Sequence, residues 1–349
     1  MASDVLNPRP TAGELRSAPG LPRPASGINR CAFLVHPLLP LHRRILGVRQ
    51  LHFPLAIGGP AGIDGVAHIA DLELPTRHGP VSAAIIAVPD LAHQLVADQH
   101  RAFILEQRAA RLAEASGATV IGLGSALAVV AGRGQALAEH TSLPVTTGQA
   151  ATAWACATIA ERVFQSSKEP IGVLGFAGTV GEAVAQRLIE RGFPVMVDAT
   201  GSANERRAQR LGATCGSVDE VVYSTRNLVG ASTTGPILDP ARMPPNRTLV
   251  DLALPPTLGP GPRPKGWTIL GGETLEVPGR RKGGFWGTIW LGLAGYGSNA
   301  IYACLAEPAT MAICGETGFS AGRHLDPKNV ARIGGLLLEL GFEPCLRKR

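Results

Sequence analysis

The segment Ile171–Asp198 constrains the fold of this 349-residue chain more than any other. It contains a short apolar run, a glycine-rich turn, an amphipathic run and a second apolar run, in that order. The turn carries three glycines at intervals of three residues: Gly175, Gly178 and Gly181. This order predicts a strand, a helix and a second strand of one parallel sheet, and therefore an α/β fold.

The three glycines have distinct expected roles in binding a dinucleotide. Gly175 permits the tight turn, Gly178 lets the backbone approach a pyrophosphate, and Gly181 lets the helix pack closely on the strand. The helix N-terminus then offers unpaired N–H groups to the phosphates. The alternative is a purely structural turn, because the chain has 43 glycines.

We expect a nicotinamide coenzyme, either NADPH or NADH, at this turn and at the ends of two further strands. The expected contacts are Gly175, Phe176, Ala177, Gly178, Thr179, Val180, Gly181, Asp198, Thr200, Ala231, Ser232 and Thr233. Asp198 favours NADH, because a carboxylate binds ribose hydroxyls and repels a 2′-phosphate. The nearby Thr200, Ser202, Arg206 and Arg207 are able to surround such a phosphate instead.

The alternation of apolar runs and helical patterns predicts a central Rossmann domain, flanked by an α/β substrate domain and a helical C-terminal region. The expected boundaries are a disordered leader at 1–30, the substrate domain at 31–168, the Rossmann domain at 169–255 and the C-terminal region at 256–349. We expect the C-terminal region, with helices at about 299–314 and 329–341, to pack on the substrate domain.

Bulk properties narrow the function classes. No apolar run reaches the roughly 18–20 residues of a spanning helix, and the six cysteines show no regular spacing, which favours a cytoplasmic protein. The net charge of +6 comes without a nucleic-acid motif, so we expect no nucleic-acid partner. The histidines form no metal-ligand pattern, and no metal is expected. The basic charge suits an acidic partner or serves solubility alone.

Cys304 is the candidate nucleophile. It follows a glycine-rich stretch and lies in the early turns of an expected helix, a placement that favours the thiolate. The competing interpretation is a small buried apolar side chain. Candidates for binding a substrate carbonyl lie between strands and helices: Ser125, Thr146, Thr147, Gly148 and Gln149. A helix N-cap explains these polar residues equally well.

Several stretches, taken together and in order, resemble a known family. They are Phe33–Pro37, Gly117–Gly124, Pro144–Gly148, the glycine turn, Val250–Asp251, Val277–Gly279, Ile301–Glu307 and Phe319–Arg323. The chain resembles the long-chain acyl-[acyl-carrier-protein] reductases, which form fatty aldehydes, and related predicted amino-acid dehydrogenases. The resemblance covers nearly everything after residue 30.

The resemblance implies a two-step reaction. Cys304, in its Ala-Cys-Leu-Ala-Glu context, would accept the acyl group from acyl carrier protein or acyl-coenzyme A, and hydride from NAD(P)H would release an aldehyde. The family favours NADPH, and a homo-oligomer is possible. The chain departs from the family at Gln149, where Asn is usual, at Pro308 within the Cys304 helix, and at Thr200, where the family has an arginine. These departures leave pocket detail, thiol placement and coenzyme choice open.

Two other functions remain open. The first is an NAD(P)-dependent dehydrogenase of a small hydroxy or amino acid, which needs a Lys–Asp type acid/base pair that the sequence does not reveal. The second is a non-catalytic nucleotide-binding protein. Activity that survives loss of Cys304 would favour the first, and coenzyme binding without turnover would favour the second.

Overall fold

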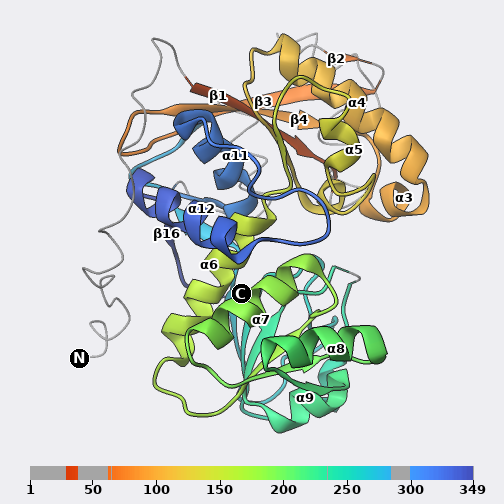
Figure 1. Cartoon of the computed structure of the whole chain (residues 1–349), viewed down its shortest axis with the longest axis vertical. Helices are drawn as coiled ribbons and strands as arrows, with labels where there is room; N and C mark the ends of the chain where they lie inside the picture. The colour runs from red at the N-terminus through yellow and green to blue at the C-terminus, as the bar shows by residue number, and fades with distance from the viewer. Residues whose placement is uncertain (1–28, 38–61, 64, 234, 284–298, 349) are drawn as a thin grey trace.

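The computed structural model describes residues 29–37, 62–63, 65–233, 235–283 and 299–348. The predicted leader, 1–30, lies almost wholly outside these ranges, but its last two residues begin a strand. The described chain forms two lobes, an upper one and a lower one in Figure 1, with helix α6 (Gln149–Phe164) running between them.

The upper lobe is built on a mixed sheet. Its described strands are β1 (Asn29–Val35), β2 (Gly62–Ile63), β3 (Val66–Leu74), β4 (Val81–Ala87), β5 (Ile121–Leu123), β6 (Val145–Thr146) and β14 (Lys282–Gly283). They run in the order β14-β3-β4-β1-β5-β6, with β2 beside β3. β4, β1, β5 and β6 are parallel; β3 pairs antiparallel to β4, and β14 and β2 pair antiparallel to β3. β4 and β1 consist almost entirely of buried apolar residues, as expected of strands covered on both faces.

Helices cover both faces of this sheet. The described helices of the N-terminal part are α3 (Ala92–Ala97), α4 (Gln99–Ala115), the short 3₁₀ turn η1 (Ser125–Ala128) and α5 (Gln135–Ala138). The sequence predicts one helix over residues 91–116. Two helices form instead, because Asp98 leaves helical geometry and caps α4 by accepting a hydrogen bond from the Arg101 N–H at 2.9 Å.

The lower lobe contains a second sheet with a diagnostic strand order. Its described strands are β7 (Ile171–Leu174), β8 (Val195–Asp198), β9 (Thr214–Gly216), β10 (Asn227–Gly230), β11 (Thr248–Asp251), β12 (Thr268–Gly271) and β17 (Arg347–Lys348). Counted from β7, the parallel strands follow the order 3-2-1-4-5-6, and β17 adds antiparallel to β12. This is the order of a doubly wound dinucleotide-binding domain, so the predicted Rossmann unit and α/β class are confirmed.

The helices of the lower lobe follow its strands. They are α7 (Thr179–Glu190), α8 (Ser202–Leu211), α9 (Val218–Ser224) and the 3₁₀ turn η2 (Pro240–Arg242). α7 begins three residues earlier than the amphipathic run alone indicates, because the glycine turn enters directly into helical geometry. β12 and β17 come from outside 169–255, so the lower sheet extends past that expected range.

The C-terminal part returns to the upper lobe. Helix α11 (Ala303–Cys314) contacts β1, β4 and β5, and α12 (Pro327–Leu340) packs on α6 and α11. The expected helix at 299–314 is wrong in its first turn, because residues 300–302 form β15 (Ala300–Tyr302). β15 pairs with β13 (Thr274–Glu276), which also pairs with β16 (Glu343–Pro344). The region is therefore less purely helical than predicted.

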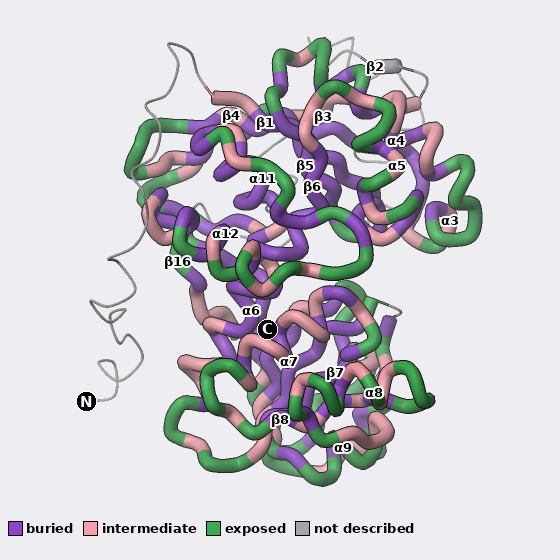
Figure 2. Tube along the Cα trace, viewed as in Figure 1, coloured by how far each residue is buried: buried purple, intermediate pink, exposed green. Residues whose placement is uncertain are grey.

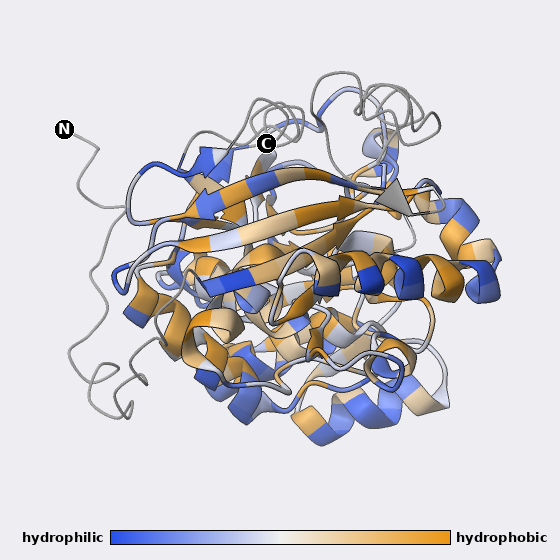
Figure 3. Ribbon diagram, turned by 90° about the horizontal axis from the view of Figure 1, so that it is seen from above, coloured by the Kyte–Doolittle hydropathy of each residue, from blue (hydrophilic) through white to orange (hydrophobic). Residues whose placement is uncertain are grey.

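Buried side chains are continuous through both lobes. Figure 2 shows buried segments along the strands of each sheet and along α6 between them, with exposed segments on the outer helices. Trp154 and Cys156 of α6 belong to the same apolar cluster as Phe33 of the upper sheet and Val173 of the lower. Seen from above, the strands of the upper sheet are mostly apolar, and the outer helices alternate apolar with hydrophilic residues (Figure 3). One apolar cluster therefore spans both lobes, and each lobe has a further cluster of its own.

Candidate active site between the lobes

The glycine turn has the backbone geometry that its spacing predicts. Gly175 adopts φ +89°, and a β-carbon there would lie 2.7 Å from the backbone of Ser232 after β10. A β-carbon on Gly181 would collide with the carbonyl oxygen of Gly175. At Gly178 the nearest atom to such a carbon is that same oxygen, 3.3 Å away, so its outer side is open. Only glycine fits at positions 175 and 181, whereas the open side of Gly178 leaves room for a ligand.

Asp198 lies under the glycine turn. Its two carboxylate oxygens accept hydrogen bonds from the backbone N–H groups of Gly175 and Phe176, each at 2.8 Å. Burial raises the pKa of this carboxyl, and the two N–H groups counteract that effect. Asp198 therefore holds the turn in shape, a role that the sequence did not reveal, and its expected contact with a ribose stays a prediction.

The crevice above the sheet opens where the strand order reverses. In doubly wound sheets this switch point, at the carboxyl ends of the first and fourth strands, is where ligands bind. Here those strands are β7 and β10, which lead into the glycine turn and into Ser232 and Thr233. The switch point faces the upper lobe, and the residues around it fit a dinucleotide.

A cavity of about 560 Å³ fills the space between the lobes. At the lower lobe it touches Val180 in the first turn of α7 together with Ser232, Thr233 and Leu252. The rest of its wall is mostly apolar and comes from the upper lobe, from Leu254 after β11 and from the C-terminal part; it includes Phe33, Val35, Pro37, Ala126, Ala128, Val129 and Tyr302. The volume lies within the range of small-molecule sites, and the wall composition suits an apolar substrate beside a coenzyme.

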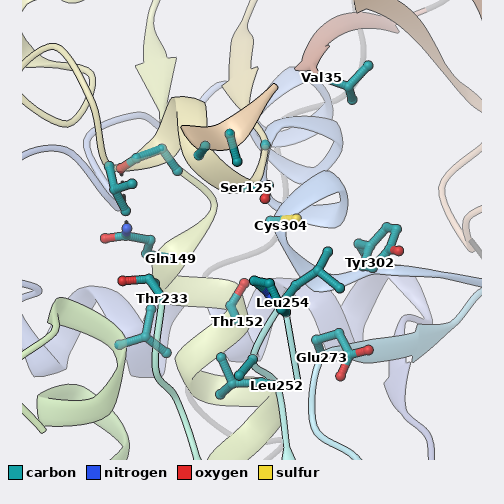
Figure 4. Close-up of a pocket in the computed structure, with 18 of the residues that line it drawn as sticks. Val35, Ser125, Gln149, Thr152, Thr233, Leu252, Leu254, Glu273, Tyr302 and Cys304 are labelled. Atoms are coloured by element: carbon teal, nitrogen blue, oxygen red, sulfur yellow. Dashed lines mark hydrogen bonds between the residues drawn. The ribbon is translucent and has the colours of Figure 1, made fainter. Parts of the chain in front are cut away.

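Cys304 lies on the wall of this cavity, at the second position of α11 and partly exposed (Figure 4). Gly148 packs directly behind it: a β-carbon there would lie 2.5 Å from the Cys304 carbonyl oxygen. Gly148 also precedes the first turn of α6, so two helices begin at the thiol. In Figure 4 the Ser125 hydroxyl points toward the Cys304 sulfur.

The electrostatic surroundings of Cys304 differ from the expectation of a ready thiolate. The pKa of this thiol is raised to about 12, mainly by burial and in addition by the carboxyl groups of Glu307 and Glu273. Backbone N–H groups at the start of α11 act in the opposite direction but are outweighed. The thiol is therefore protonated at rest.

Glu307 joins three segments behind Cys304. Its wholly buried carboxylate accepts hydrogen bonds from the hydroxyls of Thr146 and Ser320 and, at 2.7 Å, from the backbone N–H of Ala151 in the first turn of α6. Burial raises the pKa of Glu307, and these donors limit the rise. Glu307 thus caps α6 from a neighbouring helix and fixes the Cys304 turn against Gly148.

Two further polar groups on the cavity wall were not singled out from the sequence. His36 accepts a hydrogen bond on Nε2 from the Ala126 N–H at 3.2 Å, and its Nδ1 lies 3.0 Å from the Pro37 carbonyl oxygen. Burial lowers the pKa of His36, so the ring is neutral and both nitrogens are engaged. The second polar group is Glu273, which lies near Tyr302 on the cavity wall (Figure 4).

The structure sorts the predicted site residues into three groups. Those that line the cavity are Cys304, Ser125, Thr147, Gln149, Val180, Ser232 and Thr233. Thr146 and Gly148 lie behind the wall, where Thr146 holds Glu307 and Gly148 supports Cys304. The remaining coenzyme candidates, Gly175 to Thr179, Gly181, Asp198, Thr200 and Ala231, belong to the turn and the adjoining strand ends. Their contacts with a coenzyme stay predictions.

Comparisons with known proteins give limited likenesses. No family model matches the chain. Aminotransferase PigE from Serratia sp. (strain ATCC 39006) is 28% identical over 244 residues, which cover 65% of this chain but only 28% of that protein. The chain thus spans well under a third of the length of this curated relative.

Two solved structures illustrate the structural likeness. Shikimate 5-dehydrogenase from Thermus thermophilus, in complex with NADP(H) and shikimate, is 13% identical over 88% of this chain and 98% of that chain, with a TM-score of 0.35. L-tryptophan dehydrogenase from Nostoc punctiforme is 15% identical over 65% of this chain and 63% of that chain, with a TM-score of 0.31. The fold assignment rests on the strand order described above.

The described residues contain neither a metal-binding cluster nor a membrane-spanning helix. Within residues 29–37, 62–63, 65–233, 235–283 and 299–348, no three His, Cys, Asp or Glu side chains come together as a possible metal site. Over the same ranges, no helix combines the length and the apolar character that crossing a membrane requires.

Proposed function

We propose that this protein is an NAD(P)H-dependent oxidoreductase that reduces an acyl thioester to an aldehyde through an acyl group carried on Cys304. The observation that carries the proposal is the position of the Cys304 sulfur, on the wall of an apolar cavity that extends to the switch point of a dinucleotide fold. A thiol and a hydride donor that share one dry cavity are what such a reaction requires.

The first step transfers the acyl group. The Cys304 sulfur attacks the thioester carbonyl carbon, the bond to the incoming carrier's sulfur breaks, and the proton of Cys304 leaves with that carrier thiol. Because the pKa of Cys304 is about 12 at rest, proton transfer must accompany the attack. Ser125, whose hydroxyl points at the sulfur, is placed to donate a hydrogen bond to the developing oxyanion.

The second step reduces the enzyme thioester. Held at the glycine turn, a nicotinamide coenzyme would supply the hydride that the carbonyl carbon needs. The Cys304 sulfur then leaves and regains a proton, which restores the thiol and releases the aldehyde. A high thiol pKa makes the sulfur a poorer leaving group, so Ser125 and the first-turn N–H groups of α11 have to stabilise the charge that develops.

An aldehyde product accords with the curated relative. An aminotransferase exchanges a carbonyl group for an amine, so an aldehyde belongs to its substrate chemistry. The named aminotransferase has most of its length outside the match with this chain. A reductase of this kind would supply the carbonyl group that such a partner activity consumes.

Intact-mass measurement tests the covalent step. The protein is incubated without coenzyme with a panel of acyl-coenzyme A and acyl-carrier-protein thioesters, beside Cys304→Ser and Cys215→Ser, the latter cysteine lying outside the cavity lining. We expect an acyl-sized mass gain in the wild type and in Cys215→Ser but not in Cys304→Ser. Labelling that persists in Cys304→Ser would refute the proposed nucleophile.

A second function is favoured by one observation, the raised pKa of Cys304. A protonated thiol that never reacts would leave a dehydrogenase of a small hydroxy or amino acid, with Glu273 or Tyr302 as the acid/base group on the cavity wall. Turnover of such acids that is undiminished in Cys304→Ala and lost in Glu273→Gln would establish this function instead.

A further inference from the structure

An unusual loop of the upper lobe reaches the start of helix α7. Ala131, Gly132, Arg133 and Gly134 all have positive φ, from +45° to +80°. Two of them are not glycines, so the conformation is strained and needs support from its surroundings. Part of that support is a hydrogen bond from the Gly322 N–H to the Arg133 carbonyl oxygen at 2.9 Å.

The loop places the Arg133 guanidinium on the first residue of α7. Its Nη1 donates to the Thr179 hydroxyl, and that hydroxyl donates in turn to the Arg323 carbonyl oxygen at 3.1 Å. Arg133 comes from the upper lobe, Thr179 from the lower lobe and Arg323 from the C-terminal part. Three distant segments thus meet where the N–H groups of α7 lack partners earlier in the helix.

Two positively charged side chains, Arg133 and Arg323, lie near this point. Burial and the neighbouring Arg323 both lower the pKa of Arg133, which places the two guanidinium groups within electrostatic reach of each other. The nearest carboxylate of α7, that of Glu182, already pairs with Arg207 at 2.9 Å. Among the described residues, neither Arg133 nor Arg323 forms an ion pair. A second guanidinium near Arg133, close to a helix N-terminus, would favour an anion at this point.

An independent feature favours a ligand in the adjoining space. Gln149 lines the same cavity as Val180 of α7 and is only 8% exposed. Its Nε2 donates to the Ala128 carbonyl oxygen at 3.3 Å, whereas its buried Oε1 accepts no hydrogen bond from the described residues. A buried amide oxygen without a donor is costly, so a ligand that carries an N–H or O–H group is expected beside it.

We propose that Arg133 and Arg323 bind the pyrophosphate of the dinucleotide from the side opposite the glycine turn. The inference rests on the proposed coenzyme and adds that the upper lobe and C-terminal part contribute half of its phosphate site. The pyrophosphate lies between the α7 N-terminus and the two guanidinium groups, and the Gln149 Oε1 accepts from the carboxamide at the nicotinamide end. The bound pyrophosphate thereby bridges the two lobes.

Calorimetric titration with ADP-ribose, NADH and NADPH tests this assignment without any turnover. ADP-ribose contains the pyrophosphate but no nicotinamide. The variants are Arg133→Met, Arg323→Met and, as matched control, Arg111→Met on the exposed face of α4. We expect Arg133→Met to weaken all three ligands by the same factor, about tenfold or more, and Arg111→Met to bind as the wild type does.

Each result decides the matter. A double Arg133→Met/Arg323→Met variant that binds ADP-ribose within twofold of the wild type would overturn the assignment while leaving the proposed function intact. A loss confined to NADPH would also overturn it, because it would place the arginines at the 2′-phosphate. If the wild type binds none of the three ligands, the proposed coenzyme and this inference both fail. Should Arg133→Met misfold, the exposed Arg323→Met supplies the same comparison.

Discussion

The pKa of the Cys304 thiol is set by opposing effects of its surroundings. The start of α11 stabilises a thiolate, but burial and two nearby carboxyl groups stabilise the thiol more strongly. Its backbone also lies so close to Gly148 that a β-carbon at position 148 would collide with it. The residue is thus placed by packing and held unreactive until a ligand changes its surroundings.

Alkylation by iodoacetamide should show this state directly. With a thiol pKa of about 12, the thiolate fraction and the labelling rate of Cys304 should rise about tenfold per pH unit from pH 7 to 10, without a plateau. Peptide mass spectrometry follows the labelled site, with Cys304→Ala as the blank. A rate that levels off below pH 9 would show that the thiol is far more acidic than its surroundings imply.

Loss of the buried Glu307 carboxylate should strongly lower the unfolding free energy. Glu307→Ala would leave the buried Thr146 and Ser320 hydroxyls and the Ala151 N–H without their shared acceptor, so we expect a loss of about 3 kcal/mol or more in unfolding free energy. Denaturant unfolding measures it. The control is Glu316→Ala, whose pairing with Arg332 lies near the surface and should contribute about 1 kcal/mol or less.

At the scale of elements, helix α12 contains two adjacent glycines in very different surroundings. A β-carbon on Gly334 would collide with the indole of Trp154 in α6, whereas one on Gly335 meets nothing within 4 Å. The first glycine therefore permits the close approach of α12 to α6, and the second only weakens the helix.

Alanine substitutions should separate these two roles. Gly335→Ala should raise stability by up to about 1 kcal/mol through helix propensity alone. Gly334→Ala should lower it by about 1–3 kcal/mol, because the two helices must move apart. Thermal unfolding of both variants provides the comparison, and equal effects would mean that α12 does not pack on Trp154 as described.

The sequence predicts some of these elements well and others poorly. The glycine turn with its flanking strands and helix α6 were predictable, because local periodicity and turn glycines determine them. β12, β13 and β16 were not, because such short strands acquire their identity from partners far along the chain.

The candidate site shows the same division. Cys304 and Gln149, which the sequence singles out, both line the cavity, and their roles stay predictions. The roles of Asp198, Glu307 and Arg133 depend on which backbone groups the fold brings beside them, and no local pattern encodes that.

At the scale of the whole molecule, a buried carboxyl group makes stability depend on pH. Glu106 on α4 is fully buried, and neither of its oxygens has a hydrogen-bond partner among the described residues. Burial raises its pKa from 4.5 to about 8. Between these values the folded chain keeps a proton that the unfolded chain has lost, so stability falls as pH rises and levels off above pH 8.

Replacement of this carboxyl group should flatten the profile. We expect the wild type to lose roughly 4 kcal/mol between pH 4.5 and 8 from this group, as an order of magnitude, and Glu106→Gln to lose much less. Melting temperatures of both proteins at half-unit pH steps provide the test. Parallel profiles would show that the carboxyl group is solvated or paired in the folded chain.

The path of the chain between the lobes has a practical consequence. The chain passes from the upper lobe to the lower lobe along α6 and returns to the upper lobe after β12. It enters the lower lobe again after β16, so that β17 completes the edge of the lower sheet beside β12. A continuous fragment covering 169–271 would therefore contain the nucleotide-binding fold but leave β12 as an exposed edge strand with unpaired backbone groups. Such a fragment would be prone to self-association unless the last strand were grafted back onto it.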